Sequence, residues 1–245
     1  MLASFVFGAA DAALEGHSMD VVLLYHTPDP ERAVAAAARL CYAPVGAAEL
    51  LESMSDEAVA KVLKIIITSG HLSALEHASY TFAIDGVSRA LTHQLVRHRL
   101  ASYNQQSQRY VRYDGEPAFI EPPVVAADAA AHEIFVSATE AAFAAYKQLL
   151  DAGIPAEDAR YLLPNAMETK IVVSMNIREL LHFLELRCCK RAQWEIRALA
   201  LRMLELVEPT APYIFLDAGA SCRRGPCREG KMTCGDPYPK APKRD

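Results

Sequence analysis

The sequence lacks any run of about eighteen consecutive apolar residues, so it predicts no membrane-spanning helix. The N-terminal stretch MLASFVFGAADAALEGHSMD is apolar in character, but it lacks the basic residues of a signal peptide, and Asp11 and Glu15 interrupt it. Without a signal peptide we expect a cytoplasmic protein. Its six cysteines are then expected to be thiols, because an even cysteine count alone does not make a disulfide framework in a chain of this size.

Positive charge is also scarce. The chain has 25 Lys and Arg against 30 Asp and Glu, which gives a formal net charge of -5. This balance argues against a general nucleic-acid-binding protein and leaves room only for a local basic pocket. No G-x-G-x-x-G follows a strand-like run and no P-loop is present, which excludes the standard dinucleotide-binding and NTPase folds. There is no internal repeat and no low-complexity linker.

The remaining composition is that of an ordinary globular protein, with 52% hydrophobic and 22% charged residues in 245. The first strand-like run, DVVLLYH, begins directly after Met19. We therefore expect residues 1–18 to be an extension or a misassigned start, with a docking strand or helix as the alternative. A single domain is expected from 19 to 220, followed by a cysteine-rich, basic tail at 221–245.

Strand and helix patterns are mixed along the chain without regular alternation, which favours an α+β fold with a mostly antiparallel sheet flanked by long helices. Ser55 suits a helix N-cap and Gly70 a helix stop. A loop is expected at Pro122-Pro123. Strands are predicted at 21–25 (buried), 78–84 and 169–175, with short ones at 111–113 and 118–120. Helices are predicted at 30–40, 55–70, 88–98, 131–150, 155–163 and 177–207.

The most informative segment is RHRLASYNQQSQRY, from Arg97 to Tyr110. Arginine side chains bind phosphate with two parallel hydrogen bonds, and hydroxyls and amides satisfy the remaining oxygens and base edges. A lone RHR triplet is typical of a solvated charged loop. A long basic loop that alternates with so many neutral hydrogen-bonding groups instead indicates a nucleotide-binding pocket.

This segment resembles the signature of the flavin-dependent thymidylate synthases (the ThyX family), in which RHR is followed by seven residues and then Ser. Here Ser107 follows Arg97-His98-Arg99 at that spacing. The segment HLSALEH, 71–77, resembles the family block that ends in Glu-His before a strand. The segment NIRELLHFLELR, 176–187, with AQWEIR after it, resembles the family's C-terminal helix. The three blocks span nearly the whole chain after Met19.

The resemblance implies FAD as cofactor and dUMP, NADPH and methylenetetrahydrofolate as substrates, with a one-carbon unit transferred to dUMP and the flavin supplying the hydride. It implies two catalytic residues, Arg187, which polarises the uracil ring, and Ser107, which forms a hydrogen bond near it. The FAD contacts implied are His77, Ser79, Arg97, His98, Arg99, Gln105, Asn176, Arg178 and His182. The dUMP contacts implied are Gln94, Leu95, Val96, Arg97, Gln105, Gln106, Ser107, Gln108, Arg109, Arg160 (from a neighbouring subunit) and Arg187.

Two of these positions differ from some relatives: Gln105 stands where they have Glu, and His182 where they have Asn. Several also have a purely structural alternative. Asn176 with Glu179 forms a capping box, His77 fits a half-buried histidine, and Arg160 fits a partner of Glu157 on its own helix. Cys188 and Cys189 are expected to be packing residues.

The helix geometry adds an argument of its own. At about 100° per residue, Arg178 and His182 share one face and Arg187 lies roughly opposite. A single pocket beside a straight helix cannot hold both faces, so either the helix is distorted or it contributes to two active sites. The second option predicts an oligomer with sites at subunit interfaces, and the resemblance implies a homotetramer.

The cysteines do not indicate nucleophilic catalysis, because none stands in a setting that would activate a thiolate. This agrees with a flavin route that needs no enzyme nucleophile. Cys222, Cys227 and Cys234 in the tail match no standard zinc spacing, so no metal is predicted, although three thiols with one outside ligand are the alternative. Two other functions remain open: a basic-loop module that binds nucleotides or RNA, and a flavoprotein of this fold acting on another pyrimidine nucleotide.

Overall fold

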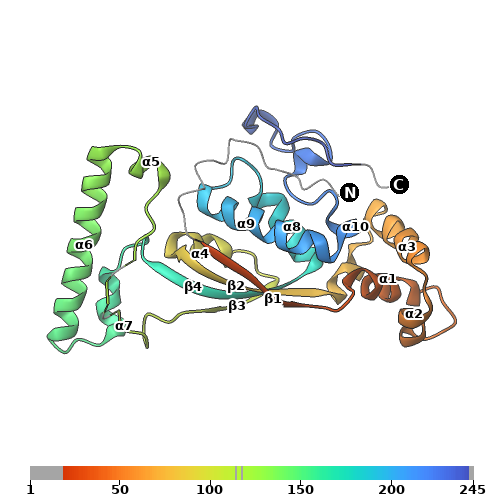
Figure 1. Cartoon of the computed structure of the whole chain (residues 1–245), viewed down its shortest axis with the longest axis horizontal. Helices are drawn as coiled ribbons and strands as arrows, with labels where there is room; N and C mark the ends of the chain where they lie inside the picture. Colours follow the sequence, from red (N-terminus) through yellow and green to blue (C-terminus); the bar gives the residue numbers. More distant parts are fainter. Residues whose placement is uncertain (1–18, 114, 117, 243–245) are drawn as a thin grey trace. The chain divides into compact units, whose positions relative to one another are not determined.

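The computed structural model describes residues 19–113, 115–116 and 118–242, so the predicted extension at 1–18 lies outside the described residues. The described chain has an α+β fold with one four-stranded antiparallel sheet in the order β1-β2-β4-β3 (Figure 1). The strands are β1 Asp20–His26, β2 Ser79–Ser88, β3 Ala101–Gln105 and β4 Glu168–Asn176. This confirms the predicted fold class and the three main strands.

The chain divides into two compact units. Of the described residues, unit 1 comprises Met19 and Asp20 together with Asp85–Gln94 and those of Gln105–Ile171. Unit 2 comprises Val21–Ile84, Leu95–Asn104 and residues 172–242. Strands β2 and β4 contribute residues to both units.

Unit 2 holds most of the helices and the larger core. Its α-helices are α1 Pro30–Leu40, α2 Ala47–Ser53, α3 Asp56–Thr68, α8 Ile177–Arg187, α9 Trp194–Val207 and α10 Pro212–Phe215. Its 3-10 turns are η2 Leu72–His77, η4 Glu208–Thr210, η5 Ser221–Arg223 and η6 Gly230–Met232. As predicted, Ser55 caps α3 by accepting a hydrogen bond from the amide of Ala58, and Gly70, at φ 72°, follows its end.

The core of unit 2 forms on the side of β2 that carries Tyr80 and Phe82, both fully buried. The Tyr80 hydroxyl lies 2.7 Å from that of Thr210, and its ring meets Phe215 edge to face at 5.7 Å. Helices α8 and α9 pack against each other beside these strands (Figure 1). This packing fixes where α8 begins relative to β2, because the amide of Ile177 donates to the carbonyl of Ala78.

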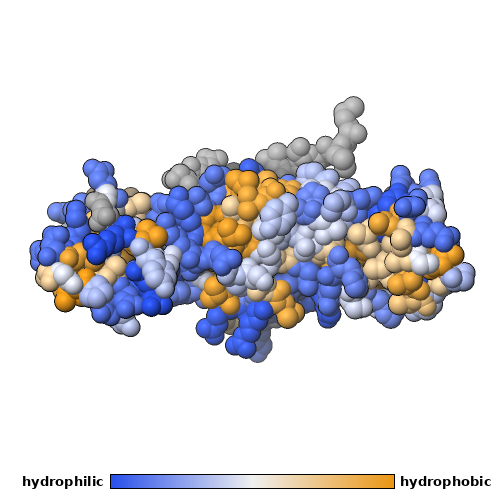
Figure 2. Space-filling view, turned by 90° about the horizontal axis from the view of Figure 1, so that it is seen from below, coloured by the Kyte–Doolittle hydropathy of each residue, from blue (hydrophilic) through white to orange (hydrophobic). Residues whose placement is uncertain are grey.

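Strand β1 was expected to be buried, and that expectation is wrong. Only Val21 is buried along it, while Val22, Leu24 and Tyr25 are 45%, 48% and 66% exposed. The reason is its position at the edge of the sheet, where a hydrophobic run lacks the cover that a central strand receives. Other large hydrophobic side chains are exposed as well, among them Leu100 and Ile134, and Figure 2 shows apolar patches on one face of the surface.

Unit 1 is built around α6 Ala129–Asp151. Asp128 caps this helix by accepting from the amides of Ala130 and Ala131, and Gly153, at φ 83°, follows its end. Phe143 and Tyr146 of α6 pack with Ala159 into a small core. The other helices of unit 1 are α4 Arg89–Leu95 (whose last residue belongs to unit 2), α5 Pro123–Ala126, α7 Ala156–Ala159 and the 3-10 turn η3 Arg160–Leu162.

Several predicted elements need correction. Residues 111–113 are not a strand, and 118–120 form a single bridge, from Phe119 to Met167. A helix begins at Pro123, where a loop was expected, because proline is favourable at the first helical position. The predicted helix at 88–98 ends at Leu95. The predicted helix at 177–207 is two helices, and Gln193 starts the second by accepting from the amides of Glu195 and Ile196.

Candidate active site

His98, the middle residue of the RHR triplet, is buried at 5% exposure against helix α8. Its Nε2 accepts a 3.1 Å hydrogen bond from Nε of Arg187, and its Nδ1 lies 3.4 Å from Oε1 of Glu179. Its ring meets Phe183 edge to face at 5.0 Å. Glu179, Phe183 and Arg187 follow one another at intervals of four residues, so they form one stripe along α8. His98 therefore packs on that stripe and contacts all three of its side chains.

The electrostatic surroundings of His98 favour its neutral form. Burial, the positive charge of Arg187 and the nearby His182 together lower the pKa of His98 to about 4, and burial contributes most. Burial also raises the pKa of Glu179 and lowers that of Arg187. Sequence reasoning had assigned Glu179 only to a capping box. Its contact with His98 is a long-range one that no local pattern shows.

The helix-face argument is only partly right. Arg178 points away from His98, and its guanidinium pairs with Glu76 of η2 at 2.5 Å. His182, however, lies with Arg187 and not apart from it, because its ring meets that of His98 at 6.0 Å. Arg187, the last residue of α8, lies on the same stripe as Glu179 and Phe183, which also contact His98.

Three of the residues predicted to bind FAD, Ser79, Arg99 and Asn176, line an open hollow in unit 2. It has a volume of about 290 Å³ and is lined by Ser79, Arg99, Leu100, Ala101, Ser102, Ser174, Met175 and Asn176. Arg99 and the neighbouring Arg97 are exposed, and no described residue bonds to either guanidinium. Hydroxyl, amide and guanidinium donors therefore face one hollow whose lining contains no carboxylate.

Asn176 caps helix α8, as the structural alternative for this residue predicted. Its Oδ1 accepts a 2.9 Å hydrogen bond from the amide of Glu179 and so caps α8, which leaves its amide nitrogen available at the hollow. The Glu179 carboxylate goes to His98, so only half of the predicted capping box forms. His77, at the end of η2, is exposed and not half-buried.

Tyr103 fixes the backbone around the triplet. Its hydroxyl lies 2.8 Å from the carbonyl oxygens of both Leu95 and His98, and its single proton is shared between these two acceptors. Burial and the charge of Glu179 raise the pKa of Tyr103. Leu95, a predicted dUMP contact, is fully buried and offers only its backbone, whereas Val96 is 41% exposed.

In unit 1 the segment from Gln105 to Arg109 follows β3 and is anchored by its own side chains. Nε2 of Gln105 donates to the hydroxyls of Thr92 and Thr169, at 3.0 and 3.3 Å. Oγ of Ser107 accepts from the amide of Arg109 at 3.2 Å. The other predicted dUMP contacts here are placed as follows: Gln94 and Gln106 are half-buried, and Gln108 is buried.

Three arginines gather in the same unit. Arg109 is exposed and pairs with Glu157 at 2.8 Å. Arg160 donates from Nε to the backbone carbonyl of Glu157, so its expected side-chain pair with Glu157 does not form. Arg89, which sequence reasoning missed, lies close enough for Arg160 to lower its pKa, although burial lowers it more. Arg89 and Arg160 are therefore like charges close to each other, and guanidinium groups are well suited to bind phosphate with two parallel hydrogen bonds.

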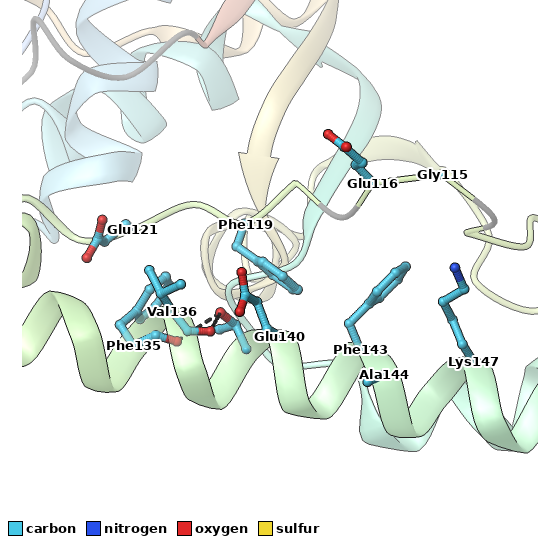
Figure 3. A pocket seen from close by; sticks show the side chains of 11 residues that line it. Gly115, Glu116, Phe119, Glu121, Phe135, Val136, Glu140, Phe143, Ala144 and Lys147 are labelled. Carbon is cyan, nitrogen blue, oxygen red and sulfur yellow. Dashed lines mark hydrogen bonds between the residues drawn. The ribbon is translucent and has the colours of Figure 1, made fainter.

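Two other cavities contain none of the predicted contacts. A hollow of about 960 Å³ lies between α6 and the segments 115–116 and 118–121, and Phe119, Phe135, Val136 and Phe143 line it (Figure 3). A smaller one is lined by Cys189, Cys222, Cys227 and Cys234. In the part of the chain that the structure describes, no three side chains are arranged to hold a metal ion. All six cysteines are free, and burial raises the pKa of Cys188 to about 12.

Among the described residues, every helix is too short or too polar to cross a membrane. The family described as "Thymidylate synthase complementing protein" matches residues 22–213. A flavin-dependent thymidylate synthase from Geobacter sulfurreducens is 60% identical over 219 residues, which cover 89% of this chain and 94% of that protein. Enzymes of the same name from Clostridium tetani and Nitratidesulfovibrio vulgaris are 48% and 49% identical, over 88% of this chain and 92% and 94% of theirs. The chain belongs to the flavin-dependent thymidylate synthase family.

Proposed function

We propose that this protein methylates dUMP to dTMP, with methylenetetrahydrofolate as the one-carbon donor and FAD, reduced by NADPH, as the source of the hydride. The observation that carries the proposal is the family match over residues 22–213, within which the RHR and Ser107 spacing is intact. The relatives named above cover most of this chain and bear the name of this activity. The residue roles below are part of the proposal.

The hollow in unit 2 fits the polar parts of FAD. Its lining offers the guanidinium of Arg99, the hydroxyls of Ser79 and Ser102 and the amide nitrogen of Asn176. These are the donors that a pyrophosphate and the flavin carbonyls require, and no carboxylate in the lining opposes them. When FAD is bound, it supplies the hydride chemistry, and the protein supplies binding, orientation and electrostatics. Arg97, Arg178, His182, His77 and Gln105 stay predicted contacts.

Arg187 has the properties needed to polarise uracil. It is half-buried, which strengthens its electrostatic effect, and its guanidinium stays charged at any physiological pH. His98 engages only Nε, so both terminal nitrogens remain to donate to N3 and the adjacent carbonyl of the ring. Developing negative charge on the ring is stabilised there. Cys188 is a poor nucleophile because its pKa is about 12, which favours a route without an enzyme thiolate.

The phosphate of dUMP is proposed to meet the arginines of unit 1. Arg109 and Arg160 are the predicted ligands, and Arg89 joins them as a third cation. Ser107 and Gln106 follow directly after β3 and would donate to the base or sugar. Bidentate arginine contacts give a phosphate both affinity and a fixed orientation.

The enzyme is further proposed to be a homotetramer with active sites shared between subunits. The exposed edge strand β1, with Val22, Leu24 and Tyr25, supports an interface with another copy, since a long hydrophobic edge is costly to leave in water. Arg160 is flanked by Tyr161, which is 83% exposed and also suits an interface. A cytoplasmic location stays a prediction.

Purified protein tests the proposal directly. We expect FAD absorbance near one flavin per chain and formation of dTMP from dUMP that requires methylenetetrahydrofolate and NADPH together. UMP and dCMP serve as controls for another pyrimidine substrate. Protein that stays colourless after incubation with FAD, or that forms no dTMP, contradicts the proposal. A monomer in solution with full activity contradicts the shared site alone.

A further inference from the structure

We infer that His98 is a positioning residue for Arg187, which holds the guanidinium in place by accepting its Nε hydrogen bond. This inference rests on the proposed function for the role of Arg187. It differs from the flavin contact that the family signature implies for His98, because a side chain that is 5% exposed and enclosed by α8 has little surface left for a ligand.

The hydrogen-bond chemistry fixes the proton on the imidazole. Arginine is always a donor, so Nε2 of His98 must be the acceptor in the 3.1 Å bond from Arg187. In the neutral ring the proton then belongs to Nδ1, which lies 3.4 Å from the carboxyl of Glu179. An isolated histidine usually protonates the other nitrogen. The surroundings of His98 therefore select the Nδ1–H tautomer.

The three residues form a chain from a helix cap to the proposed catalytic arginine. Asn176 fixes the amide of Glu179, the Glu179 carboxyl faces Nδ1 of His98, and Nε2 of His98 holds Arg187. Phe183 packs edge to face with the His98 ring, and the bond from Tyr103 to the carbonyl of His98 holds the backbone that carries it. A flexible arginine is thereby limited to one orientation before substrate binds, and this reduces the entropic cost of placing its terminal nitrogens.

Two isosteric substitutions separate the two edges of the ring. His98→Gln places an amide oxygen near the position of Nε2 and keeps an acceptor for Arg187. His98→Asn places its amide near Nδ1 and loses that acceptor. We expect His98→Asn to retain FAD but to lower kcat/KM for dUMP by about a hundredfold, as the loss of one electrostatic group does. We expect His98→Gln to stay within roughly tenfold of the wild type.

Binding and coupling measurements distinguish positioning from a general structural role. The dissociation constant of dUMP from the FAD-loaded enzyme should rise in His98→Asn and much less in His98→Gln. The double variant with Arg187→Ala should be no worse than Arg187→Ala alone, because a residue that acts only through Arg187 has nothing left to position. Equal defects in the two isosteres, additive losses, or release of FAD with normal dUMP affinity would overturn the inference.

A measurement on the unmodified protein keeps the test decisive if His98→Asn does not fold. In ¹⁵N-histidine-labelled wild type, the two ring nitrogens of His98 should report a neutral ring with the proton on Nδ1, and His98→Gln assigns the signal. A proton on Nε2, or a charged ring at neutral pH, overturns the inference. This readout needs no catalysis, so it stands apart from the FAD and dTMP assays that test the proposed function.

Discussion

The guanidinium of Arg187 donates to the imidazole of His98 over 3.1 Å, although 89 positions separate the two residues in the sequence. The bond joins the end of α8 to the RHR triplet and brings together two blocks of the family pattern. His182 lies beside the same ring. His182 and Arg187, which were expected on opposite faces of α8, therefore meet one buried histidine, whereas Arg178 pairs with Glu76.

This arrangement predicts different defects for the two arginines of α8. Arg187→Ala should lower the rate of methylation by about a hundredfold to a thousandfold with FAD still bound, since charge on the uracil ring then develops without its counter-charge. Arg178→Ala should release FAD and recover in excess cofactor. Flavin absorbance after gel filtration and turnover with and without added FAD measure both effects.

Glu76→Gln is the matched control for Arg178, because it breaks the 2.5 Å ion pair but keeps the arginine. The pair is half exposed, so its loss should cost less than about 1 kcal/mol of stability. If Glu76→Gln loses FAD as readily as Arg178→Ala, the ion pair and not the arginine is responsible.

Local patterns predicted the fold well where a local cause decides it. The caps at Ser55 and Asn176, the strand at 169–175 and the glycine stop after α3 all depend on neighbouring residues. The division of the 177–207 segment was missed because the segment contains neither proline nor glycine to mark a break. The exposure of β1 was missed because its burial depends on which strands neighbour it in the sheet.

In the candidate site, too, the sequence predicted residues but not the long-range contacts between them. The resemblance named His98, Arg187 and Arg160, but not what each of them contacts. Glu179 reaches His98 across 81 residues and Arg89 reaches Arg160 across 71, so no spacing rule could have paired them. Two structural alternatives were settled only by geometry: Asn176 does cap its helix, and Arg160 does not pair with the Glu157 side chain.

The cap at Asn176 predicts a separation of stability from FAD binding. Asn176→Ala should lower the free energy of unfolding by about 1 kcal/mol, because the amide of Glu179 loses its acceptor. Asn176→Asp keeps that acceptor and should restore the stability. It replaces the amide nitrogen at the hollow by a carboxylate oxygen, so FAD affinity should stay low. Thermal melts measure the stability of both variants, and flavin titration measures their affinity for FAD. Full FAD affinity in Asn176→Asp would show that Asn176 only caps α8 and does not bind FAD.

Arg109 is paired with Glu157 in the absence of substrate, which predicts a competition. A phosphate and the Glu157 carboxylate cannot both take the same guanidinium nitrogens. Glu157→Gln should therefore tighten dUMP binding several-fold and leave the melting temperature nearly unchanged, while Arg109→Ala should weaken it. Calorimetric titration of dUMP at low and moderate salt measures this. Unchanged affinity in Glu157→Gln would show that Arg109 does not meet the phosphate.

The depressed pKa of His98 predicts a loss of stability in mild acid. Its pKa is about 4 in the folded protein and about 6.5 in an unfolded chain. As pH falls below about 6.5, His98 becomes protonated in the unfolded state, but in the folded state it stays neutral until about pH 4. The free energy of unfolding therefore decreases across this window. The full effect is on the order of 3 kcal/mol, and about 2 kcal/mol of it is reached by pH 5.

The other charged groups around His98 are Glu179, His182 and Arg187. Burial raises the pKa of Glu179, so this residue changes the stability with pH in the opposite direction.

His98→Gln isolates the contribution of His98, because the variant cannot take up the proton. Urea unfolding followed by the fluorescence of Trp194, the single tryptophan, should show a smaller decrease between pH 7.5 and pH 5 in the variant than in the wild type. Protein concentration must be the same throughout, since oligomer assembly also shifts stability. Parallel pH profiles would mean that His98 is protonated in the folded protein at pH 5. Its Nε2 would then be a donor, and the hydrogen bond from Arg187 could not exist at that pH.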